Sequence, residues 1–171
     1  MPAPADIVPL DIAEVIVRKK SQYGRYIDTK QWDRFEDVAL RDATLSFHDV
    51  DGSILKSGGT SFHFPTATTF TNFFRKFFTD AQTLHMFGPG ELHQKGPDEV
   101  RAIWAMEDQI ILKHTAGLVQ IRGGGYYYET WREKGGDWFL ESLRLERTYQ
   151  DTSLAAKILI FLDRELGLSV V

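Results

Sequence analysis

The sequence predicts an α+β fold: a curved antiparallel sheet packed against N-terminal helices, forming a cone that encloses a pocket. Two observations lead to this prediction. Apolar residues recur every three or four positions in the first half of the chain, and they alternate with polar ones over residues 83–149. A chain of 171 residues is long enough to bury a core of its own, so we expect residues 1–171 to form a single domain.

The helical spacing predicts a first helix over residues 9–28. Its apolar face consists of Ile12, Val15, Ile16, Tyr23, Tyr26 and Ile27. A second, short helix is predicted from Trp32 to Ala39. Alternation over residues 43–49, followed by the turn pair Asp51-Gly52, predicts a hairpin. The Phe-rich stretch from Thr66 to Phe78 predicts a third helix that is heavily buried on one side.

The second half of the chain has the two-residue period of long strands, separated by short turn signals. The predicted strands are Thr83 to Gln94, Val100 to His114, Leu118 to Glu133 and Trp138 to Tyr149. A final helix is predicted over residues 153–166, ending at Gly167. Strands of this length must bend around helices, and Gly88, Gly90 and the Gly123–Gly125 run are suited to the bends.

Composition narrows the classes of partner. The chain has no cysteine, which excludes disulfides, thiolate nucleophiles and cysteine metal sites. Its net charge of −4 is modest and its Lys and Arg residues are scattered, which argues against nucleic acid or a membrane as partner. Without a signal sequence or a long apolar run, we expect a soluble cytoplasmic protein. The 13% of aromatic residues predicts either a thick core or an apolar cavity wall.

Strand alternation indicates which polar groups point into the cone. Residues expected to share inward faces are His85 with Phe87, Trp104 with Met106 and Asp108, and Tyr127 with Glu129. At the end of the first helix, Tyr23 and Asp28 would flank the opening. The candidate catalytic residues are therefore Tyr23, Asp28, His85 and Asp108. The candidate substrate-binding residues are Trp104, Met106, Phe87, Tyr127 and Glu129.

These residue types suit acid-base chemistry. A histidine exchanges protons near neutral pH, and a neighbouring carboxylate fixes its tautomer; either Asp28 or Asp108 could orient His85. Tyr23 could donate a hydrogen bond to a developing enolate. Structural roles compete with each assignment: a lone His in an aromatic strand is more often structural, and Asp28 could simply end a helix. No metal site is predicted, since one His and two carboxylates lack metal-binding spacing, and no cofactor is expected.

Four segments resemble the SnoaL-like domains of the nuclear transport factor 2-like superfamily. They are QYGRYIDTKQWDRF (22–35), LHMFGPGEL (84–92), AIWAMEDQIIL (102–112) and GGGYYYETWREKGGDWFLESLRLER (123–147). The superfamily has a cone-shaped α+β fold, and the similarity extends to scytalone dehydratase and bile-acid 7α-dehydratase. The resemblance implies an apolar substrate surrounded by Tyr, Asp and His, and it matches Tyr23, Asp28, His85 and the strand of Trp104 to Asp108. A second catalytic His of scytalone dehydratase has no counterpart, which argues against scytalone itself as substrate.

We therefore expect a cofactor-independent dehydratase, isomerase or cyclase that acts on an apolar polycyclic molecule, in polyketide or terpenoid secondary metabolism as the resemblance implies. The alternative is a non-catalytic small-molecule carrier or a dimerising accessory domain. A broad sheet with Tyr126, Tyr128 and Trp131 on its outer face would expose an apolar patch, so we expect a homodimer or homotrimer.

Overall fold

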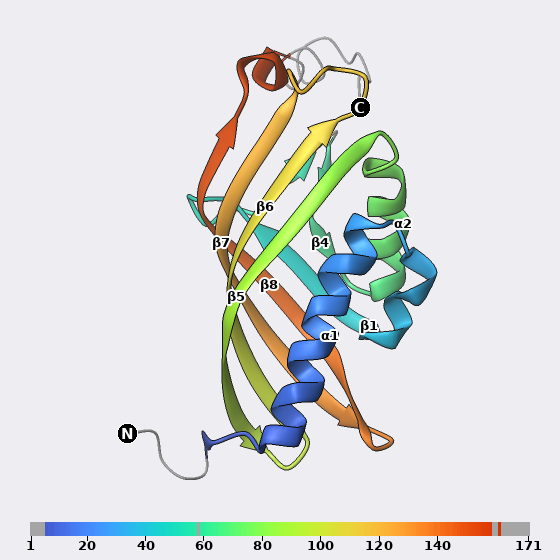
Figure 1. Cartoon of the computed structure of the whole chain (residues 1–171), viewed down its shortest axis with the longest axis vertical. Helices are drawn as coiled ribbons and strands as arrows, with labels where there is room; N and C mark the ends of the chain where they lie inside the picture. The colour runs from blue at the N-terminus through green and yellow to red at the C-terminus, as the bar shows by residue number, and fades with distance from the viewer. Residues whose placement is uncertain (1–5, 58, 159–160, 162–171) are drawn as a thin grey trace.

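The computed structural model describes residues 6–57, 59–158 and 161. Three helices, α1 (Leu10–Asp28), the 3₁₀-helix η2 (Trp32–Asp37) and α2 (Ala67–Phe77), lie on one side of a long, strongly curved sheet (Figure 1). Its four longest strands are β5 (Ala81–Gly96), β6 (Glu99–Leu112), β7 (Gln120–Lys134) and β8 (Asp137–Thr152). The α+β class and the four-stranded meander are confirmed.

The sheet has six strands in the order β4-β1-β8-β7-β6-β5 and is not closed. Strand β1 (Ala39–His48) lies parallel to β8, so the prediction of a wholly antiparallel sheet is wrong at this position. Alternation along a strand shows which of its faces is buried, but it carries no information about whether the neighbouring strand runs parallel or antiparallel. Strand β4 (His63–Phe64) pairs antiparallel with β1, whereas β2 (Lys56–Ser57) and β3 (Thr60–Ser61) form a separate ribbon.

Several element boundaries differ from the predictions, among them the start of β1, which begins at Ala39 rather than at residue 43. The second helix ends at Asp37, because Val38 and Ala39 are buried and the chain enters β1 there. Of the predicted C-terminal helix, residues 154–158 and 161 are helical, and the rest lies outside the described residues. The turn predicted at Asp51-Gly52 is present, since the Gly52 amide donates to the Asp49 carbonyl at 2.9 Å.

Phenylalanine rings fill the space between α2 and the strands β1 and β4. Thr66 caps α2 by accepting a hydrogen bond from the Thr69 amide at 3.1 Å, which fixes the start of this helix. The rings in mutual contact belong to Phe47, Phe62, Phe64, Phe70, Phe73, Phe74, Phe77 and Phe78. Of the two roles predicted for the aromatic residues, this cluster has the first, a thick core.

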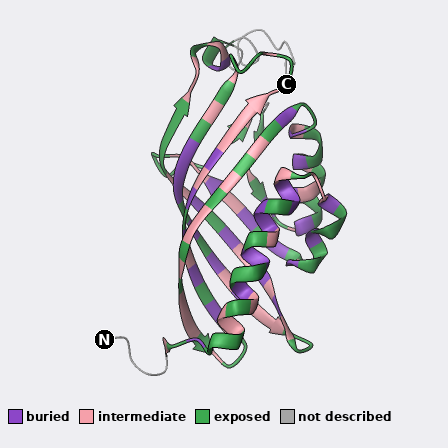
Figure 2. Cartoon of the chain, in the orientation of Figure 1, coloured by how far each residue is buried: buried purple, intermediate pink, exposed green. Residues whose placement is uncertain are grey.

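Helix α1 crosses the concave face directly over β5 (Figure 1). The approach is close at Gly24, where a Cβ would lie 2.7 Å from a ring carbon of Phe87. Burial alternates along β6 and β7, as Figure 2 shows, so one face of these strands is sealed beneath the helices. Among the described residues, no helix is long and apolar enough to cross a membrane.

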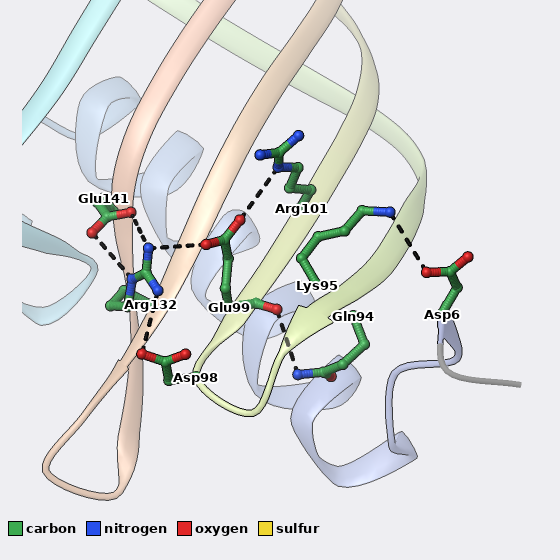
Figure 3. A network of polar contacts seen from close by, with 8 residues as sticks. All are labelled: Asp6, Gln94, Lys95, Asp98, Glu99, Arg101, Arg132 and Glu141. Carbon is green, nitrogen blue, oxygen red and sulfur yellow. Dashed lines mark hydrogen bonds and ion pairs between the residues drawn. The ribbon is translucent and has the colours of Figure 1, made fainter. Parts of the chain in front are cut away.

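The hairpin end of the sheet is held by charged side chains (Figure 3). Arg132 on β7 contacts Asp98 at 3.3 Å, Glu99 at 3.1 Å and Glu141 at 3.0 Å. These carboxylates raise the pKa of Arg132, with the hydrogen bond to Glu141 as the largest cause. The network links three strands far from the residues predicted to do chemistry.

Candidate active site

Asp28 and His85 form a hydrogen-bonded pair where α1 ends over β5. The Nδ1 atom of His85 lies 2.7 Å from Oδ1 of Asp28, and the His85 amide donates to Oδ2 at 2.9 Å. The hydroxyl of Thr83 donates to Oδ1 at 2.9 Å. The side chains of His85 and Asp28 are only 7% and 13% exposed, so His85 does not point into bulk solvent.

The contacts of Asp28 assign the proton of a neutral His85. A carboxylate can only accept, so the imidazole proton lies on Nδ1 and Nε2 keeps its lone pair. Within the described part of the chain, no hydrogen bond reaches Nε2. This atom is therefore available as a base, and the partner of His85 is Asp28 rather than Asp108.

Asp108 has a different partner, Arg147 of β8. The guanidinium contacts its two carboxylate oxygens at 3.1 Å and 2.7 Å, and both side chains are almost fully buried. Gly123 leaves the necessary space, because a Cβ there would lie 2.1 Å from a guanidinium nitrogen. The Nε–H of Arg147 is buried and has no acceptor among the described residues. Asp108 does not orient His85, although the two residues are register partners on β5 and β6.

Tyr23 of α1 and Tyr127 of β7 face each other in the interior. Each is 1% exposed, and their ring centroids are 6.1 Å apart. Burial is the main reason why the pKa of Tyr23 lies well above its usual 10.0. The neighbouring Tyr127, Glu129 and Asp108 raise it further. Burial is also the main cause of the raised pKa of Tyr127. Both phenols thus stay protonated donors, but Tyr23 is sealed, contrary to the prediction that it opens onto a pocket.

A second charged pair, Lys20 with Glu129, lies deeper in the sheet. The Lys20 ammonium contacts Oε1 of Glu129, and both side chains are at most 2% exposed. The other oxygen accepts from the indoles of Trp104 and Trp131 at 2.8 Å and 2.9 Å. Burial lowers the pKa of Lys20, an effect that Glu129 opposes. The polar atoms of Trp104 and Glu129, predicted to bind substrate, are therefore already paired with protein groups.

The ammonium of Lys20 also lies over aromatic rings. Its distances to the ring centroids are 3.8 Å for Tyr127, 4.3 Å for Phe87 and 4.6 Å for Tyr23. Met106 is packed in the same interior, at 6% exposure. Side chains thus fill the space around Lys20 between α1 and the sheet, in the region where the sequence predicts a pocket.

Two of the hollows on the described part of the chain lie away from His85, Asp28 and Tyr23. One lies between η2, the start of β1 and α2, and the other follows the loop after β1. On the concave face next to Asp108, half-buried apolar side chains continue beyond the sealed interior. Ile110 of β6 and Ile121 of β7 are register partners there, and Ile110 also faces Thr83 of β5.

Comparison with known proteins gives the family. The model of the SnoaL-like domain matches residues 10–144. The chain belongs to the SnoaL-like domain family. A Gibberella zeae protein named probable cyclase FGR4 is 44% identical over 139 residues, covering 81% of this chain and 93% of that protein.

Solved structures agree with the fold of this SnoaL-like domain. The Kfla4162 protein of Kribbella flavida has a TM-score of 0.71 at 18% identity, over 86% of this chain and 97% of the other. A Novosphingobium aromaticivorans protein, provisionally named a scytalone dehydratase, has a TM-score of 0.68 at 14% identity, over 83% and 87%. The resemblance seen in the sequence is confirmed at the level of family and fold.

Sequence reasoning missed two charged residues of this SnoaL-like domain, Lys20 and Arg147. Lys20 lies on the buried helical face with Ile16, Tyr23 and Ile27, so its spacing already placed it inside. Arg147 carries a weaker signal, because a bulge between β7 and β8 shifts its register near Gly125.

Trp131, expected on the outer face, is completely buried, whereas Tyr126 and Tyr128 are 42% and 40% exposed on that face.

Proposed function

We propose that this SnoaL-like domain is an acid-base enzyme that needs no cofactor and abstracts a proton from an apolar polycyclic molecule, leading to ring closure or loss of water. The observation that carries the proposal is the Asp28–His85 pair, in which Nδ1 is held by a carboxylate and Nε2 has no hydrogen-bond partner among the described residues. The name of the 44% identical relative, a probable cyclase, supports ring closure. The name of the Novosphingobium aromaticivorans structure supports dehydration.

In the proposed reaction, Nε2 of His85 removes a proton from a carbon next to a carbonyl. The C–H electron pair moves into an enolate, and Asp28 stabilises the imidazolium that forms. The enolate carbon then attacks a second carbonyl carbon, which closes a ring while the C=O π electrons move onto that oxygen and the imidazolium protonates it; alternatively, the enolate expels a β-hydroxyl. In the second case the imidazolium returns its proton to the leaving oxygen, and water is released.

One donor suits the enolate oxygen. Arg147 has an Nε–H next to Asp108 that meets no acceptor among the described residues, whereas Tyr23 is sealed in the interior. An apolar substrate fits the half-buried surface at Ile110 and Ile121, on the same concave face. A polyketide or terpenoid precursor has the required combination of rings and enolisable carbonyls.

Proton exchange tests this proposal without knowledge of the natural substrate. Bicyclic ketones such as 2-tetralone carry acidic C–H groups, and their exchange in D₂O can be followed by NMR. We expect the parent protein to accelerate exchange, and His85→Gln to reduce the rate by about 100-fold or more while ketone binding persists. Asp28→Asn should act similarly, whereas His63→Gln on the exposed side of β4 is a matched control.

The sealed position of Tyr23 favours one competing function, a non-catalytic binding or dimerising module. In such a protein the same polar residues only satisfy one another. A parent protein that binds bicyclic ketones without accelerating exchange would favour the module. The same conclusion would follow if His85→Gln exchanged protons as fast as the parent.

A further inference from the structure

We propose that Lys30 is a positioning residue that acts through Thr83 to keep the Asp28–His85 pair in its basic form. The catalytic consequence rests on the proposed function, but the effect on the proton affinity of His85 does not. Lys30 comes two residues after the end of α1, and its side chain turns back toward the carboxylate of Asp28 at the end of that helix.

The direction of the hydrogen bonds in this relay is fixed by chemistry. The Lys30 ammonium lies 3.0 Å from the Thr83 hydroxyl, and this hydroxyl lies 2.9 Å from Oδ1 of Asp28. An ammonium can only donate and a carboxylate can only accept. The single hydroxyl proton of Thr83 must therefore point to Asp28, so Lys30, Thr83, Asp28 and His85 form one directed chain.

The backbone at Lys30 is in a conformation that glycine would adopt more easily. The Lys30 amide donates to Ile27 at 3.1 Å and the Gln31 amide donates to Tyr26 at 2.7 Å, which is the Schellman end of a helix. At that position φ is +60°, in the left-handed region that side chains with a Cβ disfavour. Elsewhere among the described residues, positive φ outside glycine occurs at His114 and Ala116, in the turn after β6.

The side chain therefore has a use that the backbone alone does not explain. A helix end of this kind is satisfied by glycine, so the contacts of the Lys30 side chain are additional to what the backbone requires. Part of the compensation is packing, since the Lys30 ammonium lies 4.7 Å from the centre of the Phe78 ring. The Lys30 nitrogen also donates to the Thr83 hydroxyl, within the relay to Asp28.

The charges around His85 determine whether removing the Lys30 ammonium strengthens or weakens proton binding by the imidazole. Asp28 favours the imidazolium, whereas the Lys30 ammonium disfavours it. On the neighbouring strands Asp108 is neutralised by Arg147, and Tyr23 stays uncharged. Burial lowers the pKa of Lys30, with Asp28 opposing this and Lys113 adding to it. Removing the Lys30 charge should leave Asp28 less compensated, so His85 should hold its proton to a higher pH.

The test is an NMR titration of the His85 imidazole, which His85→Gln assigns among the five histidines. Lys30→Gly suits the left-handed backbone and removes the ammonium. We expect its His85 midpoint to rise by roughly 0.5–1 pH unit relative to the parent, for a charge two hydrogen bonds away. Thr83→Val should also raise the midpoint, and Thr83→Ser should restore the parent value.

Two comparisons separate this role from simple packing. Lys134→Gln removes one exposed positive charge at the far end of β7 and should leave the midpoint unchanged. Combining Lys30→Gly with Thr83→Val should shift the midpoint little more than either change alone, because the two act in one chain. A folded Lys30→Gly protein whose His85 titrates as in the parent would overturn the proposal. If Lys30→Gly shifts the His85 midpoint but the parent does not accelerate ketone exchange, the proposed role of Lys30 stands and the proposed reaction is contradicted.

Discussion

Replacing Lys20 by Met should destabilise the fold, because it leaves Glu129 buried with an uncompensated charge. The ammonium and the carboxylate are in direct contact, with side chains 2% and 0% exposed. Removing one partner of such a buried pair typically costs about 3–5 kcal/mol. The indoles of Trp104 and Trp131 still donate to Glu129, so we expect about 3 kcal/mol for Lys20→Met.

Changing Glu129 to Leu should cost more than changing Lys20. It leaves the ammonium unpaired and also removes the acceptor for two buried indole N–H groups, each worth roughly 1–3 kcal/mol when left unsatisfied. The double variant contains neither charge. Its loss of stability should therefore be smaller than the sum of the single losses by about 2–4 kcal/mol.

Urea unfolding followed by far-UV circular dichroism measures these free energies. For a domain of this size, about 3 kcal/mol corresponds to a fall of roughly 6–12 °C in the melting temperature of Lys20→Met. The reasoning would be refuted by a Lys20→Met protein within about 1 kcal/mol of the parent, since 3 kcal/mol is expected. Strictly additive losses in the double variant would also refute it.

Three further predictions concern other parts of the molecule. Gly123→Ala should displace the Arg147 guanidinium, because the new Cβ would lie 2.1 Å from one of its nitrogens. We expect the free energy of unfolding, measured in urea, to fall by about 3 kcal/mol. A loss below about 1 kcal/mol would contradict this, since it would mean that the guanidinium moves freely. Because burial raises the pKa of Tyr127, the unfolded chain releases this proton first, and this residue should lower stability above pH 10 by about 1.4 kcal/mol per pH unit, with Tyr23 adding a contribution of the same sign. Tyr127→Phe should show a shallower alkaline slope, and an identical slope would contradict the assignment. We also propose that the outer face forms a homodimer or homotrimer through Tyr126 and Tyr128; Tyr126→Lys should then sediment as a monomer at micromolar concentration, and a monomeric parent would contradict this.

The fold was largely predictable from local patterns. Helical spacing places α1 within one residue of its observed start, and two-residue alternation finds all four long strands. The same alternation correctly sends His85, Asp108 and Tyr127 to the concave face. It was misread for Trp131, which lies an odd number of positions from Tyr126 and is therefore on the opposite face.

The sequence by itself determined which face each strand residue takes, because the direction of a side chain follows from its own backbone. Which groups meet across the interior was decided by the tertiary structure alone. His85 lies level with Asp108 on the next strand, yet it binds Asp28 at the end of α1, while Asp108 binds Arg147. Such pairings depend on how the helix lies over the sheet and on where bulges shift the register. Both are set by packing between segments far apart in the chain, which no local pattern records.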